Sequence, residues 1–568
     1  MEKRLLLAVV LMTAAIMITN VLFPPPEPPV VDLSPDTVVA EAPAAAPEVP
    51  MALPMTVSAT GADTVVVESE LYRYAFSTRG AALVGAELLA YRSYVVEGEP
   101  VQLVPEGEPR FLEYGLAVGA DTVRLSRLPF QSSARHVQVT EEATAVDFTY
   151  ADETGFGVAI RYRFDPAGYL IDVSGRVEGL TGRAQLLAAL GPRLAVHEDP
   201  DHRSEREFAV VTRIPGAFER IPFRNIDGTQ GLGTGLTWAG MKDKYFLAVI
   251  LAGEQNPLVT ASARDVPDDV LATEGGQVDL PQVELTTVVP IREDGTFGFQ
   301  SYFGPQEYSR LSVIGYDLEE VTPYGYRWLQ PIIRPFAALI LWILNGLHDT
   351  LGIAYGWVLV IFGVMMRIVL WPLNAKAMRA QMKNMAVQPL MQEIREKHRD
   401  NPQKQQEAML GLYKEHGFNP LGGCLPMLVP FPVLITLFFV FQNTIAFRGA
   451  EFLWLPDLSL RDPFYILPFV LVVSMFALQW VSAHLSGMEQ NPQMKMMLYF
   501  MPIMMGAIFF MLPAGLNLYY AVTQVASIPQ QVLIAKERKR AQEELKKAVP
   551  PKLSTPAARS RGKARGKR

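Results

Sequence analysis

The chain has one cysteine among its 568 residues, Cys424. A single cysteine excludes an intramolecular disulfide. Cys424 begins an apolar segment and has no adjacent base to activate a thiolate, which favours a structural role over a catalytic one. Apolar residues make up 49% of the sequence. This fraction indicates a soluble part joined to membrane helices rather than a uniformly apolar protein.

The motifs that mark common enzymes are also missing. The sequence has no P-loop, no G-x-S-x-G and no H-E-x-x-H. One short segment, His197 to His202, brings two histidines and three acidic residues together in the manner of a metal site. With a proline in its centre, it is more typical of an exposed acidic loop. We therefore expect no catalytic residue, no cofactor and no metal site, and the protein is not predicted to be an enzyme.

Acidic residues are absent from every apolar segment after residue 420. The apolar segment before these, Gly356 to Trp371, contains Arg367. An arginine at the centre of a membrane helix costs about 2.5–3.5 kcal/mol, and each Val, Leu, Ile or Phe returns roughly 0.3–0.6 kcal/mol. Arginine stays protonated, and no carboxylate in the later segments can pair with it. The sequence therefore predicts a cationic pocket that water reaches within the bilayer.

A simpler interpretation of Arg367 is that its side chain extends to the membrane surface. Lys376 and Arg379 mark an aqueous edge. At about 1.5 Å per residue, Arg367 lies on the order of 13 Å from Lys376 along a helix. A long side chain can cover part of that distance, so spacing alone leaves both interpretations open.

The first 63 residues predict an anchor and a tether. Residues 1–23 carry Lys3 and Arg4 near their start and continue with a long apolar run that is followed directly by prolines. A cleaved signal peptide has a shorter apolar region and a small-residue cleavage site, so an uncleaved membrane anchor is favoured. Residues 24–63 are rich in Pro, Ala, Val and Glu. This composition indicates an extended linker.

Residues 64–322 show short β signals separated by turn residues. Tyr72, Tyr74 and Phe76 alternate with polar or small neighbours, as do Val146, Phe148 and Tyr150. In Ile160 to Phe164 the alternation is with arginine. Alternation with a period of two over a long, turn-rich region predicts a large antiparallel β-sandwich.

Residues 323–350 predict a helix in the membrane interface. Pro331 and Pro335 leave only Phe336 to Leu347 uninterrupted, which is too short to cross ~30 Å of hydrocarbon. Five further segments have the composition of membrane-spanning helices, at about residues 355–372, 421–441, 465–483, 496–512 and 516–534.

The loops predict the orientation of these spans. Residues 373–420 carry eight Lys and Arg, whereas residues 442–464 carry two. By the positive-inside rule, the first loop is cytoplasmic and the second external. This arrangement places residues 64–322 outside the cytoplasm and both chain ends inside.

The cytoplasmic loop, residues 373–420, predicts a helical hairpin. Ala375 to His398 forms the first helix and carries several methionines on one face. Asn401 and Pro402 provide the N-cap and first-turn proline of a second helix that continues to His416. The methionine face suits varied apolar partners, and packing of the hairpin against itself explains it equally well.

The tail, residues 536–568, holds 13 Lys and Arg against 3 Glu, although the whole chain has a net charge of −7. A basic tail beside an acidic body indicates an anionic partner for the tail, either nucleic acid or lipid headgroups. A tail that is merely solvated is the alternative.

Five motifs, in this order, resemble the YidC/Oxa/Alb3 family of membrane protein insertases. They are Arg367, Trp371 to Leu373, Asn419 to Pro426, Asp462 to Pro468, and Pro513 to Tyr520. The match is nearest to the Gram-negative YidC type with its large periplasmic domain. The resemblance implies an α+β membrane protein in the inner membrane. It would have an N-terminal anchor helix, a periplasmic antiparallel β-(super)sandwich, and a five-helix transmembrane core with a cytoplasmic helical hairpin.

The resemblance also implies a mechanism and a set of residues. A hydrophilic groove open to the cytoplasm would receive nascent membrane proteins, alone or with the Sec translocon and its accessory subunits. Arg367 would be its charge centre. The groove and the slide for apolar segments would be formed by Gly363, Phe431, Ile435, Phe438, Gln442, Met501, Met505, Phe509, Tyr519, Tyr520, Thr523, Gln524 and Ser527. For each of these residues, packing between helices explains its position at least as well.

The basic tail would contact the ribosome or anionic membrane lipids, and not DNA. The residues expected to do so are Lys536, Arg538, Lys539, Arg540, Arg561 and Arg565. Such contacts depend on salt and not on base sequence.

An anion transporter or channel with an accessory periplasmic binding domain is the alternative function. An arginine within the membrane suits anion transport. Transporters usually contain internal repeats with paired broken helices, and no repeat is visible in this sequence.

Overall fold

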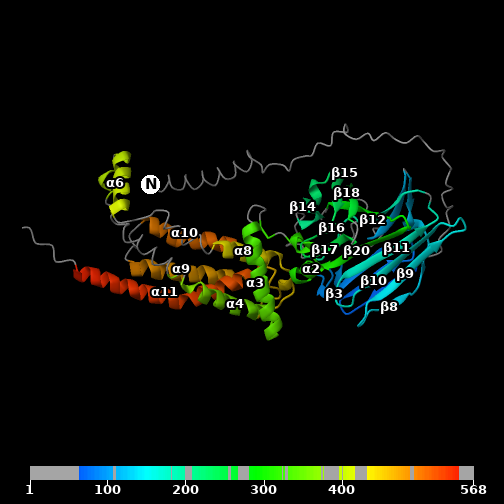
Figure 1. Cartoon of the computed structure of the whole chain (residues 1–568). Helices are drawn as coiled ribbons and strands as arrows, with labels where there is room; N and C mark the ends of the chain where they lie inside the picture. The colour runs from blue at the N-terminus through cyan, green and yellow to red at the C-terminus, as the bar shows by residue number, and fades with distance from the viewer. Residues whose placement is uncertain are drawn as a thin grey trace, which may run out of the picture. The chain divides into compact units, whose positions relative to one another are not determined.

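The computed structural model describes residues 63–548 except 106–110, 120, 181, 199–206, 254–256, 267–280, 323, 326–329, 373–374, 376–393, 395, 400, 416–430 and 487–491. The predicted anchor, nearly all of the linker, Cys424 and the last twenty residues of the tail therefore lie outside the described residues. The strands precede residue 306, and the long helices follow residue 329 (Figure 1). We call residues 63–322 the β domain and residues 330–548 the helical part.

Three sheets make up the β domain. The five-stranded sheet has the order β4 (Pro100–Gln102), β3 (Leu83–Arg92), β2 (Tyr72–Ser77), β1 (Thr64–Glu68) and β8 (His136–Gln138). The nine-stranded sheet has the order β14 (Ala217–Pro222), β13 (Ala209–Ile214), β16 (Trp238–Lys242), β17 (Phe246–Ala252), β20 (Thr296–Pro305), β11 (Leu170–Glu178), β10 (Gly157–Phe164), β9 (Thr144–Ala151) and β7 (Gln131–Ser132). The six-stranded sheet has the order β15 (Thr229–Leu236), β18 (Leu258–Val266), β19 (Gln282–Pro290), β12 (Ala184–Leu190), β5 (Glu113–Val118) and β6 (Asp121–Arg124).

The predicted antiparallel β architecture is confirmed. Among the described strands the pairs are antiparallel, except that β1 pairs with β8 in parallel. The turns η1 (Leu125–Arg127), η4 (Phe223–Asn225) and η5 (Leu318–Val321) and the short helix α2 (Tyr308–Ile314) complete the domain.

The predicted alternation places one side of each strand in the core. On β10, Ile160, Tyr162 and Phe164 are buried, while the two intervening arginines are exposed. The ring centroid of Tyr162 lies 4.6 Å from that of Phe76 on β2. Its hydroxyl lies 3.0 Å from the hydroxyl of Tyr114 on β5. Since these strands belong to three different sheets, one aromatic core holds the domain together.

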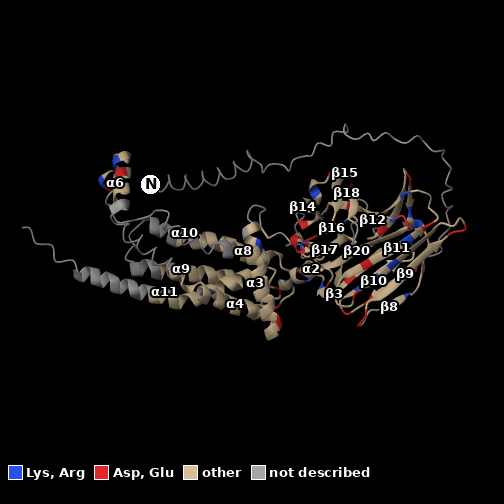
Figure 2. Ribbon diagram, viewed as in Figure 1, with Lys and Arg blue, Asp and Glu red and all other residues tan. Residues whose placement is uncertain are grey.

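The described residues of the helical part contain seven α-helices and one short 3₁₀ helix. They are α3 (Gln330–Leu351), α4 (Tyr355–Val369), α6 (Pro402–Glu415), α8 (Phe431–Asn443), η7 (Ile445–Phe447), α9 (Ile466–Ser486), α10 (Pro492–Phe509) and α11 (Ala514–Ala548). Helix α11 contacts α4, α8 and α9, while α10 contacts α9, and α3 contacts α4 and α8. Few charged residues mark the described parts of α4, α8, α9 and α10 (Figure 2).

A helix is described in each of the five segments predicted to span the membrane, although in the segment 421–441 only the residues from Phe431 onward are described. Within the described residues, however, no helix meets both the length and the apolar character required for a membrane crossing. The five spans therefore stay a prediction.

Helix α3 is longer than the twelve-residue stretch expected between Pro335 and His348. It begins at Gln330 and includes Pro335. The prediction treated both prolines as interruptions, and this was wrong. Pro331 lies in the first turn, where a backbone N–H has no partner within the helix, and Pro335 removes a single hydrogen bond. The exposed face of α3 carries Phe336, Leu339 and Trp342.

The second helix predicted within residues 373–420 is present among the described residues as α6. The side-chain oxygen of Asn401 accepts a hydrogen bond of 3.1 Å from the backbone N–H of Lys404. This is the predicted N-cap. Most of the first helix, with its methionine face, lies outside the described residues.

Candidate functional site

Arg367 lies in the last turn of α4. Its side chain is partly buried. Its Nε is buried and donates no hydrogen bond to any residue that the structure describes. Its electrostatic neighbour within the described chain is the phenol of Tyr519 on α11, not a carboxylate. Whether an acidic partner is lacking, as the sequence predicts, stays a prediction.

Helices α4 and α11 pack side by side and run in the same direction. A Cβ built on Gly363 would lie 3.0 Å from Val522 Cγ1 and 3.6 Å from Thr523 Cγ2. Just beyond the end of α4, the carbonyl of Trp371 accepts a hydrogen bond of 3.2 Å from Gln530 Nε2. Helix α11 therefore fills the space beside Gly363.

The polar residues of α11 bond mostly to backbone. The hydroxyls of Thr523 and Ser527 donate to carbonyls of their own helix, at Tyr520 and Gln524. Gln530 is fully buried, and its amide joins α11 to the end of α4. Gln530 was missed in the sequence, although it continues the spacing of Thr523 and Ser527 on one face of the helix.

An aromatic cluster lies one to two turns from Arg367 along α4. Tyr519 is buried, and its ring centroid lies 5.8 Å from that of Phe362 on α4 and 6.0 Å from that of Phe441 on α8. The ring of Tyr520 lies 5.3 Å from that of Phe509 on α10. Tyr519, Tyr520 and Phe509 therefore connect α11 with three neighbouring helices.

The other predicted residues are only partly brought together. Ile435, Phe438 and Gln442 on α8, Met505 on α10 and Gln524 on α11 are partly buried. Phe431 begins α8 and Met501 lies on α10, but their side chains lie outside the described ones. The same holds for the tail residues on α11, which are Lys536, Arg538, Lys539 and Arg540, whereas Arg561 and Arg565 lie beyond the described chain.

Apolar side chains cover the outer faces of these helices. On α4 an exposed stripe follows the helical repeat through Trp357, Ile361, Val364 and Ile368. Similar exposed residues lie on α9, α10 and α11, and they include Phe469, Val470, Val473, Trp480, Phe500, Ile503, Ile508, Val525, Ile528 and Val532. The faces that pack against neighbouring helices are apolar as well. Helices that are apolar on all sides are typical of an apolar environment.

The expectation of an exposed acidic loop at His197 to His202 fails at its first two residues, which are the ones that the structure describes. His197 and Glu198 are buried, and the rest of the segment lies outside the described residues. The ring of His197 contacts the hydroxyl of Ser93 and the carbonyl of Gln102. Burial lowers the pKa of His197 to about 4, with a smaller contribution from the nearby Arg448 charge. No group of residues suited to a metal ion occurs in the described part of the chain.

Nearby, Asp243 is buried at the turn between β16 and β17. Its Oδ1 accepts hydrogen bonds from the backbone N–H groups of Tyr245 and Phe246, at 2.8 Å and 2.6 Å. Burial nevertheless raises the pKa of Asp243 to about 7. The β domain thus contains a buried histidine whose pKa is lowered and a buried aspartate whose pKa is raised, and burial favours the neutral form of both.

Two family profiles match the chain. The profile described as the YidC periplasmic domain matches residues 64–339, and the one described as 60Kd inner membrane protein matches residues 346–542. Membrane protein insertase YidC of Ralstonia nicotianae is 32% identical over 510 residues, covering 87% of each chain. The protein of the same name from Syntrophus aciditrophicus is 28% identical over 564 residues, covering 94% of this chain and 100% of that protein.

A solved structure described as an active YidC insertase, with its first transmembrane domain resolved, covers 84% of this chain and 93% of that one. It has 16% sequence identity and a TM-score of 0.33.

The sequence matches define an inner-membrane protein with a periplasmic domain. The chain belongs to the YidC family of membrane protein insertases. The resemblance seen in the sequence is therefore confirmed. The relatives are named insertases, and insertion makes and breaks no covalent bond, so the prediction that the protein is not an enzyme is confirmed as well. The alternative of an anion transporter gains no support.

Proposed function

We propose that this protein inserts and helps to fold integral membrane proteins, with Arg367 as the cationic centre of a groove that opens to the cytoplasm. The observation that carries this proposal is a buried guanidinium nitrogen without a carboxylate partner among the described residues. An arginine that remains charged while it is buried requires contact with water or with an anionic group of a client protein.

Helices α4, α8, α9, α10 and α11 would form the membrane core. The exposed apolar stripe on α4, together with the exposed apolar residues of α9 to α11, supports this placement. An apolar surface of this extent on a water-exposed domain would be a liability for aggregation. Lipid tails would cover it at no such cost.

The electrostatics would suit clients with acidic, hydrophilic tails. Moving a polar segment across hydrocarbon is slow because its groups lose water without gaining partners. A wet cationic groove shortens the dry path and attracts negative charge, and the attraction is stronger there than in bulk water. Apolar segments of the client would then pass into lipid beside the partly buried Ile435, Phe438 and Met505.

The remaining features would follow the predicted topology. Both chain ends would lie in the cytoplasm, with an uncleaved anchor at residues 1–23 and the basic tail beyond residue 535 near the ribosome or anionic lipids. The interfacial position of α3 is supported by exposed Leu339 and Trp342 on a helix whose opposite face is buried. Cooperation with the Sec translocon is part of this proposal.

Reconstitution of the full chain into liposomes tests this function. The purified protein should insert a short membrane protein with an acidic tail, scored by protection of the translocated tail from external protease. It should not increase the flux of a small anion such as chloride. Anion flux without insertion would reverse the assignment in favour of the transporter.

A further inference from the structure

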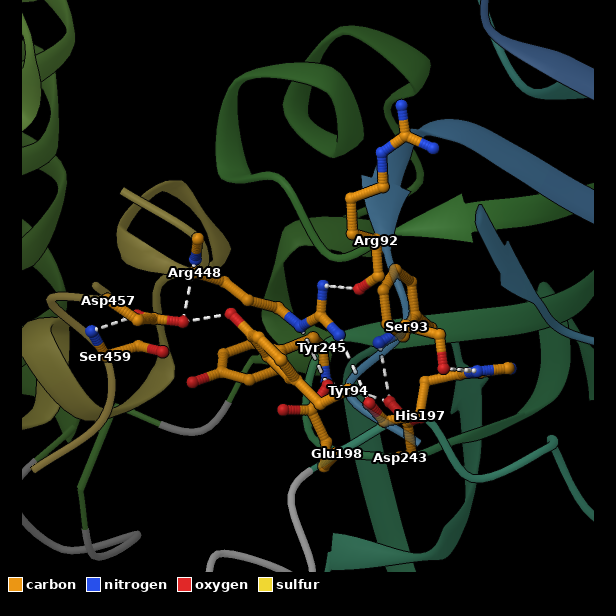
Figure 3. A network of polar contacts seen from close by, with 12 residues as sticks. Arg92, Ser93, Tyr94, His197, Glu198, Asp243, Tyr245, Arg448, Asp457 and Ser459 are labelled. Atoms are coloured by element: carbon orange, nitrogen blue, oxygen red, sulfur yellow. Dashed lines mark hydrogen bonds and ion pairs between the residues drawn. The ribbon is translucent and has the colours of Figure 1, made fainter. Parts of the chain in front are cut away.

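The loop between α8 and α9, residues 444–465, reaches into the β domain through Arg448. The side chain of Arg448 is 2% exposed and that of Glu198 is 11% exposed. Figure 3 shows the arginine extended between Tyr94 and Glu198, with Asp457 on the other side of Tyr94. Tyr94 and Glu198 are 250 or more residues away from Arg448 along the chain, whereas Asp457 belongs to the same loop.

Every nitrogen of the Arg448 guanidinium has an acceptor in the β domain. Nε donates to Glu198 Oε1 at 2.8 Å. The two terminal nitrogens donate to the backbone carbonyls of Arg92 at 2.7 Å and of His197 at 3.4 Å. The same guanidinium lies 4.4 Å from the centroid of the Tyr94 ring. A carboxylate, two carbonyls and an aromatic face match the planar, five-donor shape of arginine, which lysine cannot reproduce.

Asp457 of the same loop holds Tyr94 from the opposite side. Its Oδ2 accepts a short hydrogen bond from the Tyr94 hydroxyl and a second from the backbone N–H of Gly449, at 2.8 Å. Its Oδ1 accepts from the backbone N–H of Ser459 at 2.6 Å. Asp457 therefore fixes the shape of the loop and binds the β domain at the same time.

The other side of the loop contacts the beginnings of three helices. The carbonyls of Leu460 and Leu458 accept hydrogen bonds from the first two N–H groups of α11, Ala514 and Gly515, at 2.7 Å and 2.8 Å. Asp462 accepts from the N–H of Leu467 at 2.7 Å at the start of α9. Phe452 packs directly on Gly356 at the start of α4, where a Cβ would lie 2.1 Å from the ring. One loop thus ties these helix starts together.

A buried arginine–glutamate pair is weak support for stability by itself, because taking both charges out of water costs about as much as their attraction returns. Removing one member is much more harmful, since the other charge is left buried without a partner. Such a pair is better suited to fixing one arrangement of two parts than to holding them together tightly.

We infer that Arg448 is a positioning residue, which fastens the α8–α9 loop into the β domain so that this domain braces the starts of α4, α9 and α11. The role of this brace in insertion rests on the function proposed above, whereas the brace itself rests on the contacts just described. Loss of Arg448 leaves the loop held to the β domain only by its other contacts, such as that of Asp457 with Tyr94, and the helix starts that the loop caps then open more often.

Hydrogen exchange of the full chain in detergent measures the brace directly. In Arg448→Met, the amides of Ala514 and Gly515 should exchange at least tenfold faster than in the unaltered protein, because their acceptors belong to the loop. Arg448→Lys should lie between the two, since it keeps the charge but loses the planar fork. Arg461→Met is the matched control, because Arg461 is an exposed arginine of the same loop and should leave both amides unchanged.

The double variant Arg448→Met with Glu198→Gln guards against a folding defect. It removes the buried charge of Glu198 together with that of Arg448, so its thermal midpoint should recover toward that of the unaltered protein while the two amides still exchange fast. Slow exchange in both Arg448→Met and the double variant would overturn the inference.

Insertion of an acidic-tailed client, measured on the same double variant, tests the role of the brace. It should fall at least threefold, with no loss in Arg461→Met. Fast exchange together with unchanged insertion would overturn the positioning role. If the unaltered protein inserts nothing, the proposed function fails, and the exchange result still decides whether the brace exists.

Discussion

Replacing Arg367 with methionine is expected to reduce insertion of a client with a strongly acidic tail by tenfold or more, while a client with a neutral tail is nearly unaffected. Methionine keeps an unbranched apolar stem and removes only the charge. At an effective dielectric of about 20, two charges 4 Å apart attract by about 4 kcal/mol. A tenfold change needs only about 1.4 kcal/mol, so the expected loss allows for substantial screening by water.

Two variants separate the charge from the shape of this site. Arg367→Lys should keep most of the insertion of acidic clients, because the lysine ammonium is also cationic. Arg461→Met removes an exposed arginine from the α8–α9 loop and should have no effect. The measurement is the fraction of client tail protected from protease in liposomes. Equal loss for acidic and neutral clients in Arg367→Met would show that the residue acts through packing and not through its charge.

Acidification from pH 6.5 to pH 4 is expected to destabilise an Asp243→Asn variant by about 3 kcal/mol through His197. Burial lowers the pKa of His197 from 6.5 to about 4. The folded state therefore binds fewer protons than the unfolded state in this window. The stability that neutral His197 contributes is fully present above pH 6.5 and is lost as the pH falls to about 4.

Asp243 has to be removed first because it acts in the opposite direction. Its pKa is raised from 3.8 to about 7, so its stabilising contribution is present at low pH and is lost as the pH rises through this window. Asparagine stays neutral and can still accept from the backbone N–H groups of Tyr245 and Phe246. Comparing Asp243→Asn with Asp243→Asn/His197→Gln, by thermal unfolding of the full chain, isolates the histidine. The same pH dependence in both variants would contradict the assignment.

The sequence predicted the β domain well, because alternation in strands such as β10 reports directly which side chains are buried. Local signals were equally reliable. Asn401 caps α6 as expected, since a cap depends on residues three positions apart. The prolines of α3 were misjudged because the cost of a proline depends on how far it lies from the helix start, which the sequence alone did not give.

Contacts between distant segments could not be predicted. Glu198 and Arg448 are 250 residues apart, and a charged residue in a loop is ordinarily exposed. The same limit applies to Gly363, whose lack of a side chain indicates either free space or a closely packed partner. Only the position of Val522 on α11 shows that the second applies.

The central claim is that water from the cytoplasmic side reaches the polar face of α11 beside Arg367. Cysteine labelling tests it in a Cys424→Ser background, with Gln524→Cys on that face and Val525→Cys on the exposed apolar face as the matched control. A membrane-impermeant maleimide should modify Gln524→Cys in inside-out vesicles and not in right-side-out vesicles, and it should modify Val525→Cys in neither. If Gln524→Cys is closed to the reagent in inside-out vesicles, the hydrated cationic groove does not exist.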